Sequence, residues 1–188
     1  MDEFGYLSVL LSIIIGLAIT QLLLGFRGLV LARARVVPYA PPVVWAVSLV
    51  LIAVQSWWAM FGLREQTTWT FLQFSVVLAQ TILLYMLAGL VLPDFVGEKP
   101  IDLRAHYYEH RGVFFGAAVA SGLVSLAKDL IISGHLPAAP NVAFHVVYIG
   151  TALAAALTAR EWYHRLLAPV ILALFCIYIM VLFTRLPG

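Results

Sequence analysis

Charged residues are scarce in this sequence. Asp, Glu, Lys and Arg make up 11% of the 188 residues, whereas soluble domains average roughly 25%. This scarcity excludes an ordinary soluble globular domain. The net charge of +2 is the ordinary consequence of the basic loops described below, so we expect no nucleic-acid partner.

Cysteines and signal-peptide features are also lacking. The single cysteine, Cys176, can form no intrachain disulfide and does not indicate a redox compartment. Met1, Asp2 and Glu3 lack the positive charge that opens a signal peptide, and the apolar run after them is too long for a signal-peptide core. We therefore expect the first run to be retained as a membrane span.

Long apolar runs dominate the chain. It is 63% hydrophobic, with a mean hydropathy of +1.01. Six runs are long enough to cross about 30 Å of hydrocarbon, and no soluble domain is left over. The sequence therefore predicts one all-α, polytopic domain, 1–188, with six transmembrane helices. These runs are 4–26, 43–62, 70–92, 112–133, 141–159 and 166–184.

The basic residues predict an orientation. Lys and Arg accumulate in cytoplasmic loops, and eight of them share one side of a six-span arrangement, against Arg64 and Arg185 on the other. Loops 27–40, 94–111 and 160–165 are therefore expected in the cytoplasm, with both termini outside. We expect an integral protein of a bacterial inner membrane. The eight are Arg27, Arg33, Arg35, Lys99, Arg104, Arg111, Arg160 and Arg165.

The fourth run contains two formal charges, Lys128 and Asp129. Ionisable groups inside a span indicate function by default, and adjacent helical residues do not face one another, so we expect partners on other helices. There are two alternatives. The lysine could snorkel to the nearby end of the run, or the helix could stop near Ala127 and leave 130–140 as an interfacial loop.

Two faces of this fourth helix differ in side-chain size. The bulky face is expected to meet lipid, and the small face to pack against other helices. On the first span, small or polar residues likewise form two lines that predict helix packing. On the fourth helix, the bulky face is Phe115, Val119, Leu123, Leu126 and Leu130, and the small face is Ala118, Gly122, Ser125 and Asp129. On the first span, one line is Ser8, Ser12, Gly16 and Thr20, and the other line is Ala18, Gln21, Gly25 and Gly28.

Further polar residues are expected near the charged pair. His145 and Tyr148 lie at its depth on the fifth span, and the second and third spans contribute Gln55 and Gln73. A packing histidine and buried amides are the alternative interpretation. Together with Lys128 and Asp129, these residues are the predicted outer polar site.

A second candidate site lies in the cytoplasmic loops. His106 and His110 are four residues apart with Glu109 close by, and Glu161 and His164 are three apart. Both spacings can place two ligands on one metal ion, as in helical di-iron proteins. The alternative is a charged, aromatic segment at the membrane surface.

The sequence also contains a short internal match. Segment 38–47 aligns with 137–146 at five of ten positions, and each copy opens the middle helix of a set of three. Three spans per half would make the halves, 1–93 and 112–188, an inverted 3+3 repeat joined by loop 94–111. Loops that enter apolar helices favour these residue types, so chance similarity is the alternative.

Several short segments resemble uncharacterised small multi-pass membrane proteins of bacteria. The resemblance covers most of the chain, and it brings no activity or functional residue with it. Its elements are Gly16-Leu-Ala-Ile-Thr-Gln21, Trp57-Trp58, Leu92-Pro-Asp94, Asp102-Leu-Arg-Ala-His106 and Arg111-Gly-Val-Phe-Phe115.

Three functions fit these patterns. The first is a channel or carrier for a proton, an ion or a small polar solute, which uses the outer polar site. The alternative is a non-catalytic membrane subunit or a homo-oligomer, with partners in the lipid bilayer. The second alternative is an enzyme with the cytoplasmic His and Glu metal site. We expect no cofactor.

Overall fold

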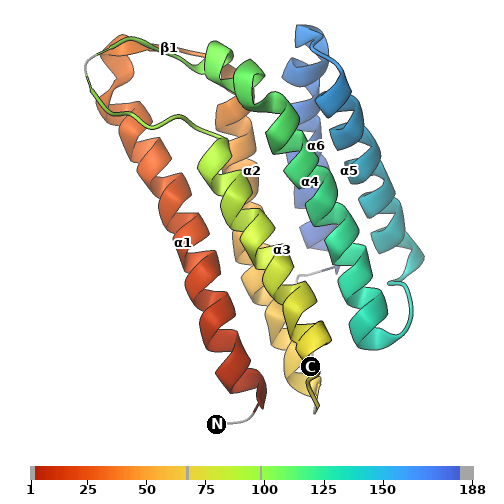
Figure 1. The fold of residues 1–188 in the computed structure, drawn as a ribbon. Coiled ribbons are helices and arrows are strands. Elements are labelled where there is room, and N and C mark those ends of the chain that lie inside the picture. Colours follow the sequence, from red (N-terminus) through yellow and green to blue (C-terminus); the bar gives the residue numbers. More distant parts are fainter. Residues whose placement is uncertain (1–2, 67, 98, 183–188) are drawn as a thin grey trace.

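The computed structural model describes residues 3–66, 68–97 and 99–182. Within them, six long helices run alternately up and down (Figure 1), and each is long and apolar enough to cross a membrane. The predicted all-α fold with six apolar helices is confirmed. The helices are α1 Glu3–Leu31, α2 Ala40–Met60, α3 Phe71–Leu90, α4 Leu103–Ser133, α5 Ala139–Leu157 and α6 Glu161–Leu182, with 3-10 turns η1 Arg33–Arg35 and η2 Phe61–Glu65.

The two ends of the bundle differ in charge. Helices α1, α3 and α5 end, and α2, α4 and α6 begin, at the upper end in Figure 1. The eight basic residues assigned to one side all lie toward this end, in the connections or near the adjoining helix ends. We call it the basic end and the other the opposite end. The residues are Arg27, Arg33, Arg35, Lys99, Arg104, Arg111, Arg160 and Arg165.

A small parallel sheet ties two connections together at the basic end. Strand β1, Val36–Val37, pairs with β2, Ile101–Asp102. The Arg35 guanidinium donates to the backbone oxygens of Phe95 and Lys99, at 3.1 and 2.9 Å. These bonds fasten the α1–α2 connection to the α3–α4 connection. The sequence predicted only loops there.

Helix α4 is longer than predicted at its start. The expected span began at residue 112, but the helix begins at Leu103 because the Asp102 carboxylate accepts hydrogen bonds from the first free backbone N–H groups. It ends at Ser133, and the C-cap residue Gly134 has a φ of 74°, a left-handed conformation that favours glycine. The helix therefore continues past Ala127, and the alternative of a stop there is wrong.

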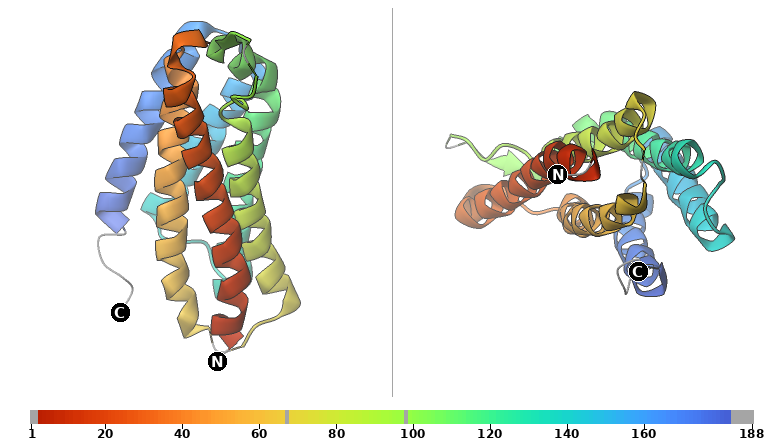
Figure 2. Two further views of the ribbon diagram at one scale, coloured as in Figure 1. Left: turned by 90° about the vertical axis from the view of Figure 1, so that its left-hand side faces the viewer. Right: turned by 90° about the horizontal axis from the view of Figure 1, so that it is seen from below.

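The helices pack side by side in one bundle (Figure 2). Helix α3 packs between α1 and α4, α4 packs against α5, and α2 lies between α1 and α6. Glycine allows α4 and α5 to approach closely, because a Cβ on Gly122 would lie 2.6 Å from Cγ1 of Ile149 on α5. The small face of α4 thus packs as predicted. Leu123 and Leu130 point outward, but Phe115 is fully buried, so its predicted lipid contact is wrong.

The two halves do not pack alike. Helices α1 and α3 of the first half are in extensive contact, whereas the described parts of α4 and α6, the corresponding pair, hardly meet. Helices α2 and α5, which the matching segments open, do run in opposite directions. This is a consequence of three helices per half, so the inverted repeat stays a prediction.

Candidate functional site

A cavity of about 310 Å³, lined by polar and apolar side chains, lies in the half of the bundle toward the opposite end. All six helices line it, and its volume is at the lower limit of the roughly 300–1,000 Å³ usual for small-molecule sites. Its size therefore suits an ion with its water shell or one small solute. Its polar lining residues are Gln55, Ser56, Gln80, Thr81, Ser121, Ser125, Lys128, Asp129, Ser133, Asn141, His145 and Tyr178.

Lys128 and Asp129 face this cavity as a pair. The Lys128 Nζ lies 3.5 Å from Oδ1 of Asp129, and the two side chains are 22% and 25% exposed. Within residues 3–66, 68–97 and 99–182, the two charges therefore pair with each other, which differs from the expected ion pairs with other helices. Adjacent Cβ atoms point apart on a helix, but the four-carbon lysine stem is flexible enough to bring its ammonium back to the carboxylate. Both side chains are half-buried on the cavity wall, and the snorkelling alternative stays a prediction.

His145 bridges α4 and α5 at the cavity wall. Its Nδ1 lies 2.8 Å from the backbone oxygen of Asn141, and its Nε2 lies 3.0 Å from the Ser125 hydroxyl. A carbonyl oxygen only accepts, so Nδ1 carries the hydrogen, and in the neutral ring Nε2 accepts from Ser125. His145 is therefore both a packing residue and part of the lining.

Asn141 and Tyr178 extend the polar wall to α6. The Tyr178 hydroxyl donates to Oδ1 of Asn141 at 3.1 Å. Neither residue was among the predicted site residues. The sequence does contain a signal for both, since Asn141 lies four residues before His145 on one helical face and Tyr178 interrupts an apolar run. Only the packing of α6 beside α5 brings them together.

Two predicted residues lie outside the cavity lining. The Gln73 side chain accepts from the backbone N–H of Thr70 and closes a capping box at the start of α3. Tyr148 packs beside Gly122 and stacks on Phe144. The structure thus brings together Lys128, Asp129, His145 and Gln55 of the predicted set.

Large aromatic side chains fill the bundle toward the basic end. Trp45 contacts Phe114 and Phe115, with ring centroids 5.8 and 5.5 Å apart, and Phe115 contacts His164 at 5.7 Å. Trp45, Phe115 and His164 are buried, from α2, α4 and α6 respectively. We call Trp45, Tyr107, Phe114, Phe115 and His164 the aromatic layer. It packs between the connections of the basic end and the half of the bundle that holds the cavity.

Both nitrogens of His164 have partners in this layer. Nε2 lies 2.8 Å from the backbone oxygen of Thr158, so it carries the hydrogen and donates. Nδ1 lies 2.9 Å from the Tyr107 hydroxyl, which donates to it in the neutral ring. Nearby, the hydroxyls of Tyr39 and Tyr108 are 3.2 Å apart. Burial is the main cause that raises the pKa of Tyr39, and the hydrogen bond with Tyr108 is the second, so Tyr39 stays protonated.

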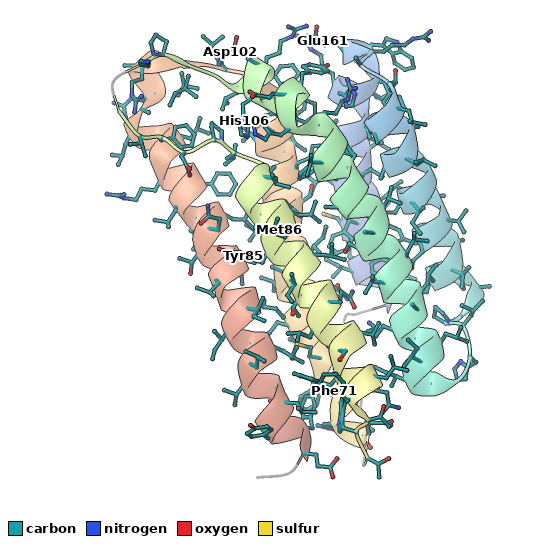
Figure 3. The ribbon with its side chains drawn as sticks, viewed as in Figure 1. Phe71, Tyr85, Met86, Asp102, His106 and Glu161 are labelled. Carbon is teal, nitrogen blue, oxygen red and sulfur yellow. The ribbon has the colours of Figure 1, made fainter. Side chains whose placement is uncertain are left out.

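The predicted metal ligands are engaged elsewhere. Glu161 pairs with Arg104 at 3.1 Å and with Arg165 at 2.7 Å. His106 contacts the backbone oxygen of Leu90 through Nε2. Figure 3 labels His106 and Glu161 at the basic end.

The histidine rings of His106 and His110 do lie together, with centroids 4.4 Å apart. The His110 Nδ1 is 3.0 Å from the backbone oxygen of His106, and Glu109 is exposed. Within the described part of the chain, no three His, Cys, Asp or Glu residues are placed to hold one metal ion. His106 and His110 thus place ring nitrogens against backbone oxygens, and the metal site stays a prediction.

Comparison with known proteins found no matching family model, curated protein or solved structure.

Proposed function

We propose that this chain is an integral membrane carrier that binds a small polar solute or ion in the cavity and moves it across the bilayer. The observation that carries the proposal is the position of a charged pair, Lys128 and Asp129, on the wall of a cavity inside an apolar bundle. Charged groups inside a membrane bundle are costly and mark solute or ion pathways.

Insertion into a membrane is supported by the outer surface of the bundle. Large apolar side chains cover it, among them Leu17, Leu123 and Val181 at 51%, 54% and 67% exposure. A surface of this kind is unfavourable in water, and six apolar helices of sufficient length suit a bilayer. We further propose a bacterial inner membrane, with the basic end in the cytoplasm.

A carrier fits better than an open channel. The cavity occupies one half of the bundle, and the aromatic layer fills the bundle toward the basic end with packed rings such as Trp45 and Phe115. A solute entering from the opposite end would stop at this layer. Passage then requires the layer to open, which is the alternating access of a carrier.

Reconstitution into liposomes tests the proposal. We would measure proton flux with an entrapped pH dye, and entry of glycine, urea and glycerol by light scattering under an osmotic gradient. Ser121→Trp fills the cavity, and Leu123→Trp, on the outward face of the same helix, is the matched control. Gel filtration verifies that both variants fold.

We expect at least one of these fluxes to exceed that of empty liposomes and to be blocked only by Ser121→Trp. Equal flux through the two tryptophan variants, or no flux of any probe above empty liposomes, would overturn the carrier.

The homo-oligomer alternative has one observation in its favour. On α1, Gly16 and Thr20 of the predicted packing line are exposed, and a Cβ on Gly16 would have no neighbour within 4 Å. Small residues on an outer face let a second helix approach closely. Oxidative crosslinking of Gly16→Cys in a Cys176→Ala background, with Leu17→Cys as the control on an adjacent face, tests whether two copies meet there.

A further inference from the structure

We infer that the cavity binds a small zwitterion, a solute with one ammonium and one carboxylate group, such as a small amino acid. The inference names the substrate class of the proposed carrier, and its transport claim rests on that proposed function. The binding claim needs only the cavity and its charges.

Lys128 and Asp129 have unused hydrogen-bonding capacity. An ammonium has three donors and a carboxylate about four acceptor sites. Among the described residues, neither side chain takes part in a hydrogen bond, and their one mutual contact is 3.5 Å long. Charge-assisted bonds are normally about 2.7–2.9 Å. Both groups therefore remain available to a ligand in the cavity.

The charges of the cavity favour a ligand that is neutral overall. The other titratable groups on its wall are His145, which bonds Asn141 and Ser125, and Tyr178, which bonds Asn141. A lone cation would be attracted by Asp129 and repelled by Lys128 beside it, and a lone anion would meet the reverse. A zwitterion pairs its carboxylate with Lys128 and its ammonium with Asp129, and no net charge enters the low-dielectric interior.

Size and lining agree with a small zwitterion. A volume of about 310 Å³ admits one solute of amino-acid size at the lower limit of known ligand sites. The remaining lining mixes amides and hydroxyls, such as Gln55, Gln80 and Ser121, with apolar side chains such as Ile15 and Ile132. This mixture suits a ligand whose two charged groups lie close together and whose remainder is short.

Equilibrium dialysis of the purified full chain tests the binding. The probes are radiolabelled glycine, L-alanine and L-serine, with acetate, methylammonium and urea as competitors that have one charge or none. We expect saturable binding of at least one amino acid, and competition by unlabelled amino acid that is at least about tenfold stronger than by acetate or methylammonium. Failure of all three amino acids to bind, or equal competition by a singly charged analogue, would overturn the inference.

Single-charge variants test which groups hold the ligand. Lys128→Met and Asp129→Asn should each weaken amino-acid binding by about 25-fold or more, since each leaves one ligand charge unpaired. Asp129→Asn should bind acetate better than wild type, and Lys128→Met should bind methylammonium better. The matched control is Arg64→Met, which removes a cation from another adjacent ion pair, Arg64 and Glu65, on the exposed surface. It should leave binding unchanged.

Two further outcomes separate the inference from the proposed function. Amino-acid binding without any flux in liposomes would retain the zwitterion site and refute the carrier. Flux of urea or protons without amino-acid binding would retain the carrier and refute the zwitterion site. If the single variants do not fold, the double variant Lys128→Asp with Asp129→Lys exchanges the two charges and keeps both. We expect it to bind amino acids more tightly than acetate, as wild type does. A double variant that no longer prefers amino acids over acetate would count against the inference.

Discussion

Gly122→Ala should destabilise the bundle by separating α4 from α5. The added Cβ would lie 2.6 Å from Cγ1 of Ile149 and 3.3 Å from Cδ1 of Tyr148. Carbon atoms in contact normally lie about 3.5–4.0 Å apart, so Ile149 must move by about 1 Å. Overpacking of this kind costs about 1–3 kcal/mol. Alanine favours the helix over glycine by about 1 kcal/mol, so the net loss of unfolding free energy is about 0–2 kcal/mol.

Gly116→Ala is the matched control on the same helix. A Cβ at Gly116 would have no neighbour within 4 Å, so this variant receives only the gain in helix propensity. The difference between the two variants removes that gain and isolates the overpacking, about 1–3 kcal/mol. Reversible unfolding by dodecyl sulfate in mixed micelles, followed by circular dichroism, measures both free energies.

Equal unfolding free energies for Gly122→Ala and Gly116→Ala would refute the close approach of α4 and α5. A second comparison locates the contact, since Ile149→Ala removes the side chain that the new Cβ meets. The loss in Gly122→Ala should then be smaller in the Ile149→Ala background than in wild type. Additive losses would show that the strain lies elsewhere.

The remaining predictions concern the charged pair, the orientation and the aromatic layer. The single variant Lys128→Met should lose more unfolding free energy than the double variant Lys128→Met with Asp129→Asn, because the single change leaves a half-buried carboxylate without its counter-ion. An unchanged unfolding free energy for Lys128→Met in the same micelle assay would contradict this. Of single cysteines placed at Gln66 and Pro100 in a cysteine-free background, only the first should react with an impermeant thiol reagent in intact cells, and the reverse would invert the orientation. Tyr107→Phe leaves the buried histidine nitrogen without its donor and should cost about 1–3 kcal/mol of unfolding free energy.

The helices could be predicted because apolar run length is a direct requirement of a bilayer. Their ends were less predictable. The first turns of α4, Leu103 to Arg111, are polar and resemble a loop in sequence, although Asp102 is a recognisable N-cap residue. The pattern predicts lipid contact for Phe115 because small residues are the usual sign of helix packing in membranes. Size alone does not distinguish a lipid-facing ring from one that fills the centre of the bundle.

The candidate site was predictable in its depth and composition but not in its contacts. Helical spacing placed His145 near the level of Lys128, and both line the cavity. Spacing also suggested Gln73, but local capping by Thr70 takes its side chain, as the Thr-x-x-Gln pattern could have indicated. The contribution of Tyr178 depends on how α6 packs beside α5, and the residue pattern of a single sequence does not predict that packing.

Under the proposed function, the strength of the basic end decides how the carrier opens. The Arg104–Glu161 ion pair joins α4 to α6, but its side chains are 55% and 34% exposed, and exposed pairs contribute only about 0–1 kcal/mol. The aromatic layer contributes more, since each ring pair adds about 0.5–1.5 kcal/mol beyond the burial of its area. Phe115 takes part in two such ring pairs, one with Trp45 and one with His164. Because α4 and α6 have few backbone contacts, these rings are the main connection between them. Opening toward the basic end therefore requires repacking of the aromatic layer, and breaking the surface ion pair alone would not achieve it.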